Sequence, residues 1–274
     1  MSQHPTLTVL VCAATGTVGR RLVPLLEQRG ATVSTYDRTA DPEPQLVGVD
    51  AVFLACPNVE TQFAYEVAII DAAARAGVGR LVKLSARGVA LDSPVAFWDR
   101  HARIEQHLAS SGVPAVVLRP GFSMGNLLAQ VDTVRTTGVL PVPAADSRVA
   151  MIDPVDVAAV AAVALTDSDL PLGAYELTGP VALDFARVAR SWTAAAGQPV
   201  TYVDVPPDQA VPAMTDAGVP AFVAAQIATV FAALRAGVQA DVTADVHRVT
   251  GRPARSIDDF LADALGVPAG AGRG

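Results

Sequence analysis

The sequence lacks the residues and runs that define several classes of protein. Its 274 residues include only two cysteines, Cys12 and Cys56, which are too few for a disulfide framework or a zinc site, so no metal is expected. Aromatic side chains make up 5%, and no apolar run is long enough to cross a membrane as a helix. The opening residues carry no signal-peptide pattern. These absences predict a cytoplasmic protein without a membrane partner.

Positive charge is scarce as well. The sequence has 20 basic residues against 27 acidic ones, which gives a net charge of -7, and the basic residues form no run. A nucleic-acid partner is therefore not expected, because binding to a phosphate backbone needs clustered positive charge. The chain is instead 51% hydrophobic, which is enough for a large core. This composition favours a cytoplasmic enzyme or binding protein.

The most informative stretch lies near the start of the chain. An apolar run over 7–12 leads into the loop Ala13-Ala14-Thr15-Gly16-Thr17-Val18-Gly19, and a helix is expected over 20–29. Strand, glycine turn and helix in this order are typical of dinucleotide-binding proteins, because the helix N-terminus offers unpaired N–H groups and a positive dipole to a pyrophosphate. Gly16 allows close approach of the phosphates, and Gly19 allows the helix to pack on the strand.

One glycine of the usual fingerprint is missing. Ala13 occupies the position of the first glycine, which normally makes the tight turn. An alanine fits this turn if its φ stays negative, because its methyl group disfavours the left-handed region. A dinucleotide site is therefore expected on the condition that the φ of Ala13 is negative.

Short apolar runs then alternate with helical patterns along the chain. Strands are expected at 32–36, 50–55, 81–85, 114–118, 149–153, 174–178 and 200–203, and helices at 60–76, around 97–108, at 154–166, at 183–196, twice within 206–237 and at 257–265. This alternation predicts an α/β fold with a Rossmann-type, doubly wound parallel sheet that is covered by helices on both faces. Ligands of such sheets lie beyond the carboxyl ends of the strands, so the loops after the strands should share one edge.

The chain is expected to divide into a larger and a smaller part. Residues 1–155 should form an NAD(P)-binding Rossmann domain, with the sheet completed by residues 156–180. Residues 181–274 should form a smaller α/β lobe that is mostly helical and holds the substrate, with a disordered tail at 267–274. No internal repeat or flexible linker separates the two parts.

Coenzyme selectivity depends on the end of the second strand. Asp37 and Arg38 stand side by side there. An acidic residue accepts hydrogen bonds from the ribose hydroxyls of NAD, whereas an arginine pairs with the 2′-phosphate of NADP. The two residues therefore leave both coenzymes open, and they are equally compatible with a solvated Asp-Arg pair on a loop that binds no coenzyme.

Several motifs resemble the NmrA-like branch of the atypical short-chain dehydrogenase/reductases. The most specific ones are Tyr175-Glu176-Leu177-Thr178-Gly179-Pro180 and Val249-Thr250-Gly251-Arg252-Pro253, and the glycine loop, 50–54, 84–85, 119–122 and 126–128 also match, so that the resemblance covers nearly the whole chain. The resemblance implies an NAD(P)H-dependent oxidoreductase of the quinone or dye reductase type. It favours NADP over NAD, because Arg38 falls on a basic position of the family.

The sequence patterns and this resemblance together place the coenzyme on the loops that follow the first five strands. The coenzyme-binding residues are expected to be Ala14, Thr15, Gly16, Thr17, Val18, Gly19, Asp37, Arg38, Cys56, Pro57, Ser85, Pro120, Gly121 and Phe122. By resemblance, Cys56 and Pro57 border the adenosine, and the last four border the nicotinamide.

The catalytic groups depart from the family pattern. No tyrosine is followed by a lysine four residues later, so the usual Tyr-x-x-x-Lys pair is absent. The remaining candidates are Ser85 as a hydrogen-bond donor to the substrate or the nicotinamide ribose, His101 for proton transfer and Asn126 to orient a substrate carbonyl. Each has a structural alternative: a strand-end cap for Ser85, a half-exposed helix position near Glu105 for His101 and a helix cap for Asn126. Lys83 is expected in a structural ion pair.

Three functions fit these features. The first is hydride transfer from NAD(P)H to a small aromatic, quinone-like or conjugated carbonyl substrate, in secondary metabolism, by a monomer or homodimer. The second is a non-redox isomerase, cyclase or lyase on a drifted scaffold, for which Ala13 would be a sign. The third is a regulatory protein that binds NAD(P) and senses its redox state without turnover.

Overall fold

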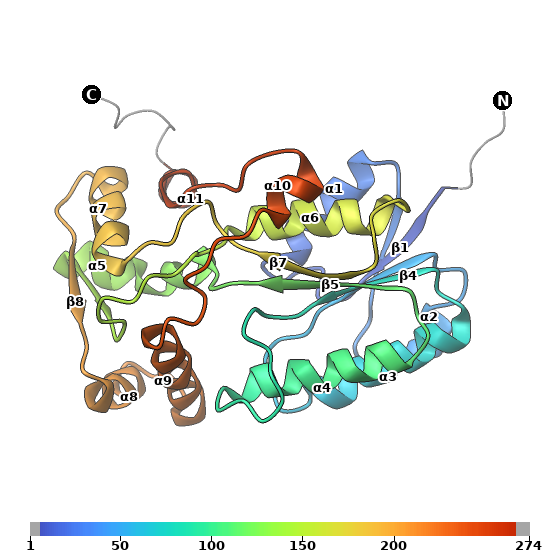
Figure 1. Cartoon of the computed structure of the whole chain (residues 1–274), viewed down its shortest axis with the longest axis horizontal. Helices are drawn as coiled ribbons and strands as arrows, with labels where there is room; N and C mark the ends of the chain where they lie inside the picture. The colour runs from blue at the N-terminus through green and yellow to red at the C-terminus, as the bar shows by residue number, and fades with distance from the viewer. Residues whose placement is uncertain (1–5, 267–274) are drawn as a thin grey trace.

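The expected α/β fold is confirmed by the computed structural model, which describes residues 6–266 (Figure 1). The disordered tail expected at 267–274 lies outside the described residues. A six-stranded, all-parallel sheet has the order β2-β1-β3-β4-β5-β7. Its strands are β1 (Thr8–Val11), β2 (Thr32–Thr35), β3 (Ala51–Leu54), β4 (Arg80–Leu84), β5 (Ala115–Pro120) and β7 (Gly173–Leu177). The strand order reverses beside β1, and ligands of open α/β sheets bind at such a point.

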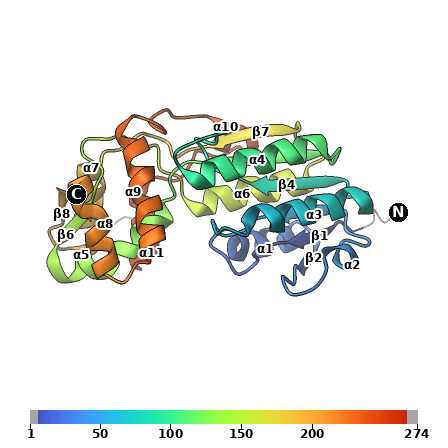
Figure 2. The ribbon, with the colours of Figure 1, turned by 90° about the horizontal axis from the view of Figure 1, so that it is seen from below.

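Helices cover both faces of this sheet (Figures 1 and 2). On one face lie α1 (Gly19–Gln28), α6 (Pro154–Thr166) and α10 (Asp245–Thr250), and on the other lie α2 (Pro42–Gln45), α3 (Gln62–Ala76) and α4 (Ala96–Ser110). Strand β3 is buried along its whole length because helices cover it on both sides, which explains its uninterrupted apolar sequence. Helix α6 begins where the Asp153 carboxylate accepts a hydrogen bond from the Val155 N–H at 2.8 Å.

A second group of elements lies at one end of the molecule (Figure 2). It comprises η1 (Met124–Gln130), α5 (Val131–Thr137), β6 (Val139–Val142), α7 (Phe185–Ala196), β8 (Thr201–Asp204), α8 (Pro207–Asp216), α9 (Ala221–Arg235) and α11 (Ile257–Leu265). Strands β6 and β8 form a parallel pair, and Phe185, Trp192 and Phe231 are buried in its core. Residues from 124–151 also enter this core, so segments on both sides of position 155 build it. The domain boundaries at 155 and 181 stay a prediction.

The strand expected at 149–153 is wrong. Val149 forms an isolated bridge with Leu183, and Ile152 forms another with Ser123. Between them, the Ala150 N–H donates to the carbonyl of Gln239 at 3.0 Å. Because neighbouring residues bond to three different segments, no regular ladder develops despite the strand-like composition.

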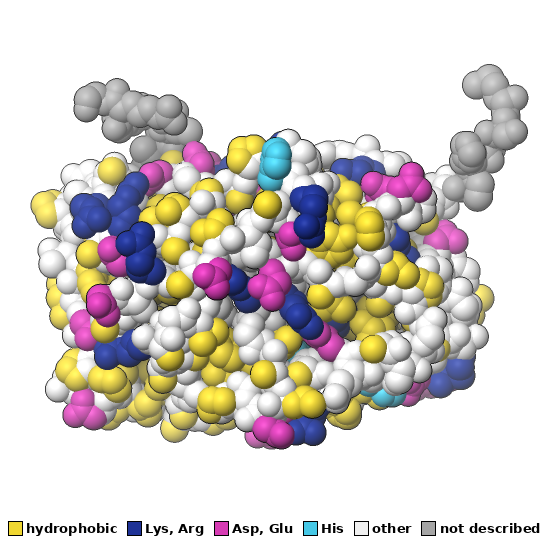
Figure 3. Space-filling view, in the orientation of Figure 1, with side chains coloured by type: hydrophobic (Ala, Val, Ile, Leu, Met, Phe, Trp, Pro, Cys, Tyr) yellow, Lys and Arg dark blue, Asp and Glu magenta, His cyan; other side chains and the backbone are white. Residues whose placement is uncertain are grey.

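The described residues reveal neither a membrane-spanning helix nor a metal cluster. Within 6–266, no helix combines the length and hydropathy that a membrane crossing needs, and no three His, Cys, Asp or Glu side chains gather as ligands for a metal ion. Figure 3 shows basic and acidic side chains interspersed among apolar ones on one face of the molecule.

Candidate active site

The loop after β1 has the form of a phosphate-binding cradle. The Gly16 N–H donates to the Ala13 carbonyl at 2.9 Å and closes a tight turn. Helix α1 then starts at Gly19 with no side-chain cap and no acidic residue in its first turn, so its positive end favours an anion. A Cβ placed on Gly19 would lie 2.2 Å from the Ala13 carbonyl oxygen, so only glycine fits there. This cradle fits the phosphates of a dinucleotide.

Ala13 adopts the conformation opposite to the expected one. Its φ is 55°, in the left-handed region, so the turn forms although the condition of a negative φ is not met. The left-handed region costs an alanine about 1–2 kcal/mol, since its Cβ crowds the following carbonyl. The cradle is therefore built without the first glycine, at the expense of local strain.

Ala13→Gly is expected to raise the free energy of unfolding by up to about 1 kcal/mol. Glycine removes the strain of about 1–2 kcal/mol but adds freedom to the unfolded chain worth about 0.4–1 kcal/mol. Urea denaturation measures the difference. Ala14→Gly is the matched control: Ala14 does not have a positive φ, so this variant should lose stability. A lower free energy of unfolding in both variants would show that Ala13 is not strained.

The end of β2 presents Arg38, rather than Asp37, to a ligand. The Asp37 carboxylate accepts hydrogen bonds from the Thr39 N–H at 2.8 Å and hydroxyl at 2.7 Å, which hold the pKa of Asp37 below its ordinary value. The Arg38 guanidinium carbon lies 4.9 Å from the centroid of the Tyr65 ring. Both side chains are exposed on a loop, as in the alternative of a solvated Asp-Arg pair, and no carboxylate in residues 6–266 forms an ion pair with Arg38. An arginine held on a ring without an acidic partner suits a phosphate.

The two cysteines lie at the same edge of the sheet. Cys12 is buried, and burial raises the pKa of its thiol to about 12. Cys56 is only half-buried, and its Sγ lies 3.9 Å from Nη2 of Arg38. Pro57, next in the chain, is exposed. Cys12 is thus a buried apolar side chain, whereas Cys56 borders the space beside Arg38.

A cavity of about 1040 Å³ adjoins this edge. Its walls come from the loops after β3, β4 and β5, from α4, and from η1, α8 and α9 of the second group of elements. The lining is mostly apolar and includes the rings of Phe97, Trp98, Phe122, Phe222 and Phe231. Its size and lining suit a flat, apolar small molecule.

The expected nicotinamide loop, Pro120-Gly121-Phe122, lies on the cavity wall and is fixed by a residue that the sequence patterns do not reveal. The Phe122 N–H donates to Oε1 of Gln239 at 2.7 Å, and Nε2 of Gln239 donates to the Arg87 carbonyl at 2.9 Å. Gln239 is buried, has a φ of 78° and also lines the cavity. It comes from an irregular segment after α9, where no periodicity marks a functional residue.

Ser85 lies behind the cavity wall. Its side chain is buried, and its hydroxyl donates to Oε1 of Glu105 at 2.5 Å. The other oxygen of Glu105 accepts from Nη2 of Arg119 at 2.5 Å. The next residue, Ala86, is the one that reaches the cavity. The Ser85 hydroxyl therefore belongs to a network that links β4, α4 and β5.

His101 also lies behind the wall, in a buried polar cluster. Its Nδ1 is 3.1 Å from Nζ of Lys83, and that ammonium lies 2.7 Å from Oε2 of Glu66, with both charged side chains fully buried. The structural ion pair expected for Lys83 is confirmed. Burial and the Lys83 charge hold the pKa of His101 well below its ordinary value, so its imidazole is neutral and accepts from Lys83. A half-exposed position for His101 is wrong, since it is 4% exposed.

Asn126 differs from the other two catalytic candidates because it lines the cavity. It is exposed and lies in η1. The cap of η1 is Ser123, whose hydroxyl accepts from the Gly125 N–H at 3.1 Å, so the expected alternative of Asn126 as a cap is wrong. Within residues 6–266 its side-chain amide forms no hydrogen bond, so it is available to a ligand.

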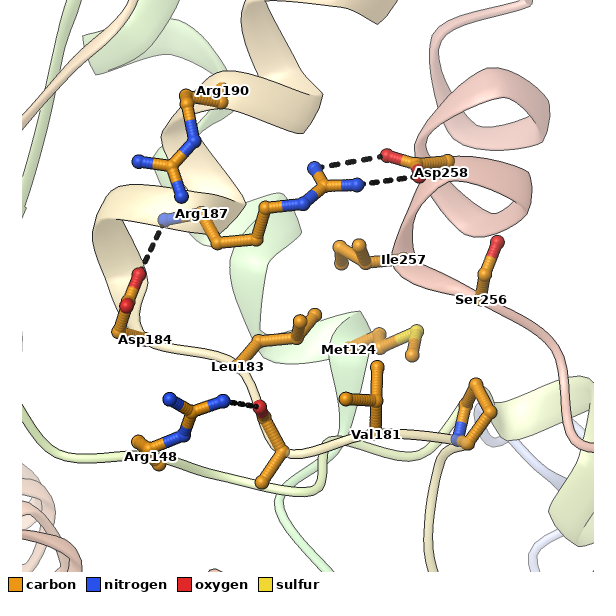
Figure 4. A pocket seen from close by; sticks show the side chains of 12 residues that line it. Met124, Arg148, Val181, Leu183, Asp184, Arg187, Arg190, Ser256, Ile257 and Asp258 are labelled. Carbon is orange, nitrogen blue, oxygen red and sulfur yellow. Dashed lines mark hydrogen bonds and ion pairs between the residues drawn. The ribbon is translucent and has the colours of Figure 1, made fainter.

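A second pocket, of about 440 Å³, lies between the N-terminal ends of α7 and α11 (Figure 4). Arg148, Arg187 and Arg190 surround it, but Nη2 of Arg187 pairs with Asp258 at 2.9 Å, and Arg148 donates to the Ala182 carbonyl at 3.0 Å. None of the residues expected to bind the coenzyme lines it. The candidate active site is therefore the larger cavity.

Comparison with known proteins agrees with this geometry. The model of the NmrA-like family matches residues 26–249. The chain belongs to the NmrA-like family. Among relatives of this NmrA-like protein, an NAD(P)H azoreductase of Xenophilus azovorans is 36% identical over 92% of this chain and 96% of its own. A (4-alkanoyl-5-oxo-2,5-dihydrofuran-3-yl)methyl phosphate reductase of Streptomyces griseus is 33% identical over 93% of this chain and 97% of its own.

A solved structure shares the fold. The NADPH-dependent quinone oxidoreductase of Escherichia coli, in complex with NADPH, superimposes on the NmrA-like chain with a TM-score of 0.84. The match covers 94% of this chain and 99% of the other at 24% identity. The sheet and the second group of elements thus follow one known architecture over nearly their whole length.

Proposed function

We propose that this NmrA-like protein is an NAD(P)H-dependent oxidoreductase that prefers NADPH and transfers hydride to a quinone-like or conjugated carbonyl small molecule. When bound, the coenzyme supplies the hydride. The position of the cavity supports the proposal most: an apolar space of about 1040 Å³ adjoins the edge where the phosphate cradle and Arg38 lie. The coenzyme and the acceptor would then bind next to each other at the carboxyl ends of the same strands.

The names of the relatives support the choice of acceptor. An azoreductase, a reductase of a 4-alkanoyl-5-oxo-2,5-dihydrofuran and a quinone oxidoreductase all name acceptors with a conjugated double bond. Such acceptors are flat, which suits the ring-lined cavity. A cytoplasmic location, a monomeric or homodimeric state and a role in secondary metabolism stay predictions from the sequence.

In this proposal the residues divide by position. Residues 14–19 bind the pyrophosphate of the coenzyme, and Arg38 binds its 2′-phosphate. Cys56 and Pro57 contact the adenosine, and residues 120–122 contact the nicotinamide. Asn126 donates a hydrogen bond to the acceptor oxygen as charge develops there. Ser85 and His101 lie behind the wall and hold its elements in place through their hydrogen bonds with Glu105 and Lys83 respectively. A quinone accepts hydride readily, so solvent can complete the protonation without a tyrosine acid.

The first test is Arg38→Ala. We expect the Kd for NADPH to rise by roughly 10–100-fold, since a hydrogen-bonded charge pair contributes about 1.5–3 kcal/mol and each tenfold is about 1.4 kcal/mol. The Kd for NADH should change by less than about twofold, because NADH has no 2′-phosphate. Fluorescence of the bound nicotinamide measures both constants, and NADPH oxidation with 1,4-naphthoquinone measures turnover.

Arg135→Ala serves as the control, because Arg135 is a largely exposed arginine that pairs only with Asp132 at 3.0 Å among the described residues. It should leave both dissociation constants as they are. Equal NADPH affinity in wild type and Arg38→Ala would refute the 2′-phosphate contact. Tight coenzyme binding without turnover of any quinone would refute the oxidoreductase and favour a sensor.

A further inference from the structure

Arg100 has an unusual position on the cavity wall. It lies on α4, is half-buried, and is the one charged residue among the lining residues that the structure describes. No hydrogen bond or ion pair joins its guanidinium to any residue within 6–266. Its neighbours on the same helix are different: Nε of Arg103 pairs with Asp99 at 2.8 Å. The Arg100 charge is therefore left to a ligand.

The coenzyme phosphates do not account for this charge. None of the residues of the cradle, 13–19, lines the cavity, and neither does Arg38. Arg100 instead shares the wall with the rings of Phe97 and Trp98 and with Asn126. An anion that meets Arg100 thus belongs to the molecule that fills the apolar space.

The lining defines the chemistry of that molecule. An apolar wall that carries one guanidinium and a few uncharged amides fits a flat hydrophobic body with a single acidic substituent. A half-buried arginine has lost part of its hydration and gains most from a charge-assisted, bidentate pair with a carboxylate, sulfonate or phosphate. An acidic partner within the protein would cancel this preference, but none is present among the described residues.

We propose that Arg100 selects acceptors that carry an acidic group, so that the substrates of this enzyme are anionic conjugated compounds. That the anionic ligand is reduced rests on the proposed function. The preference for an anionic ligand follows from the cavity alone. Arg100 pairs with the acidic substituent and turns the conjugated body toward Asn126 and the loop 120–122. The net charge of -7 gives the protein no general attraction for anions, so the preference must come from this site.

Binding of two ligands that cannot be reduced tests the proposal. The probes are 2-naphthalenesulfonate and the uncharged 2-naphthalenemethanol, titrated by calorimetry into protein saturated with NADP⁺. The wild type should bind the sulfonate more tightly. In Arg100→Gln, the Kd for the sulfonate should rise by about tenfold or more, and the Kd for the alcohol by less than about twofold. Arg100→Lys should keep part of the preference for the sulfonate. Arg103→Gln is the control on the same helix and should change neither.

Several outcomes would overturn the proposal. They are a wild type without preference for the sulfonate, an equal loss of both ligands in Arg100→Gln, and a loss of NADP⁺ affinity in that variant, which would assign Arg100 to the coenzyme. A parallel assay compares reduction of 1,4-naphthoquinone and its 2-sulfonate. If neither quinone is reduced while the binding preference holds, the proposed function fails and the anion site stands.

Discussion

Gly19→Ala is expected to abolish dinucleotide binding and to destabilise the protein. The added Cβ would lie 2.2 Å from the Ala13 carbonyl oxygen and 2.8 Å from the Cα of Ala14. These are backbone atoms, which cannot rotate away as a side chain can, so α1 or the cradle must move. We expect a loss of about 2–3 kcal/mol in the free energy of unfolding. NADPH affinity should fall by at least about 100-fold, because the helix N-terminus no longer faces the phosphates.

The sign of the stability change decides this prediction. Gly19 is the first residue of α1, and alanine is the better helix former by about 1 kcal/mol, so without the steric conflict the variant would gain stability. Gly16→Ala is the matched control, since its Cβ would lie 3.1 Å from the same carbonyl oxygen and the loop can yield slightly. The melting temperature and the NADPH affinity should both be highest in the wild type, lower in Gly16→Ala and lowest in Gly19→Ala. A Gly19→Ala protein with unchanged affinity and a higher melting temperature would contradict the cradle.

The central sheet could be predicted because its signals are local. Strands buried on both faces have uninterrupted apolar runs, as at 51–54, and glycine turns and capped helix starts separate them. The order of strands and helices then leaves few parallel topologies. The edge that collects the cradle, Arg38, Cys56 and the loop 120–122 follows from the rule that ligands bind at the carboxyl ends of the strands.

The remaining features depend on contacts between distant segments. Gln239 reaches Phe122 across 117 positions of the sequence, and nothing near Gln239 signals the contact. The φ of Ala13 could not be predicted from the residue type either, because alanine favours a negative φ and the φ in this turn is positive. For His101, a half-exposed position is typical of its helix pattern, but the packing of α3 on α4 buries it beside Lys83. Local preference yields in each case to tertiary context.

Lys83→Met is expected to lower the free energy of unfolding by about 3–5 kcal/mol at pH 8. Lys83 is the only lysine of the sequence, and its ammonium and the Glu66 carboxylate are both fully buried at 2.7 Å. The substitution keeps the apolar stem but leaves the buried carboxylate with Nε2 of Gln62, at 3.0 Å, as its donor. Urea denaturation at pH 8 measures this loss.

A double-mutant cycle separates the charge from the packing. Combining Lys83→Met with Glu66→Gln removes both charges, so the double variant should be more stable than Lys83→Met alone. The charge of Lys83 is also a cause of the low pKa of His101, after burial, so that pKa should rise in Lys83→Met, as NMR of the imidazole protons can report. Arg103→Met breaks the half-exposed pair with Asp99 and should cost little stability, because water screens an ion pair at the surface. A Lys83→Met protein that loses no more than Arg103→Met would show that the buried pair is not a charged one.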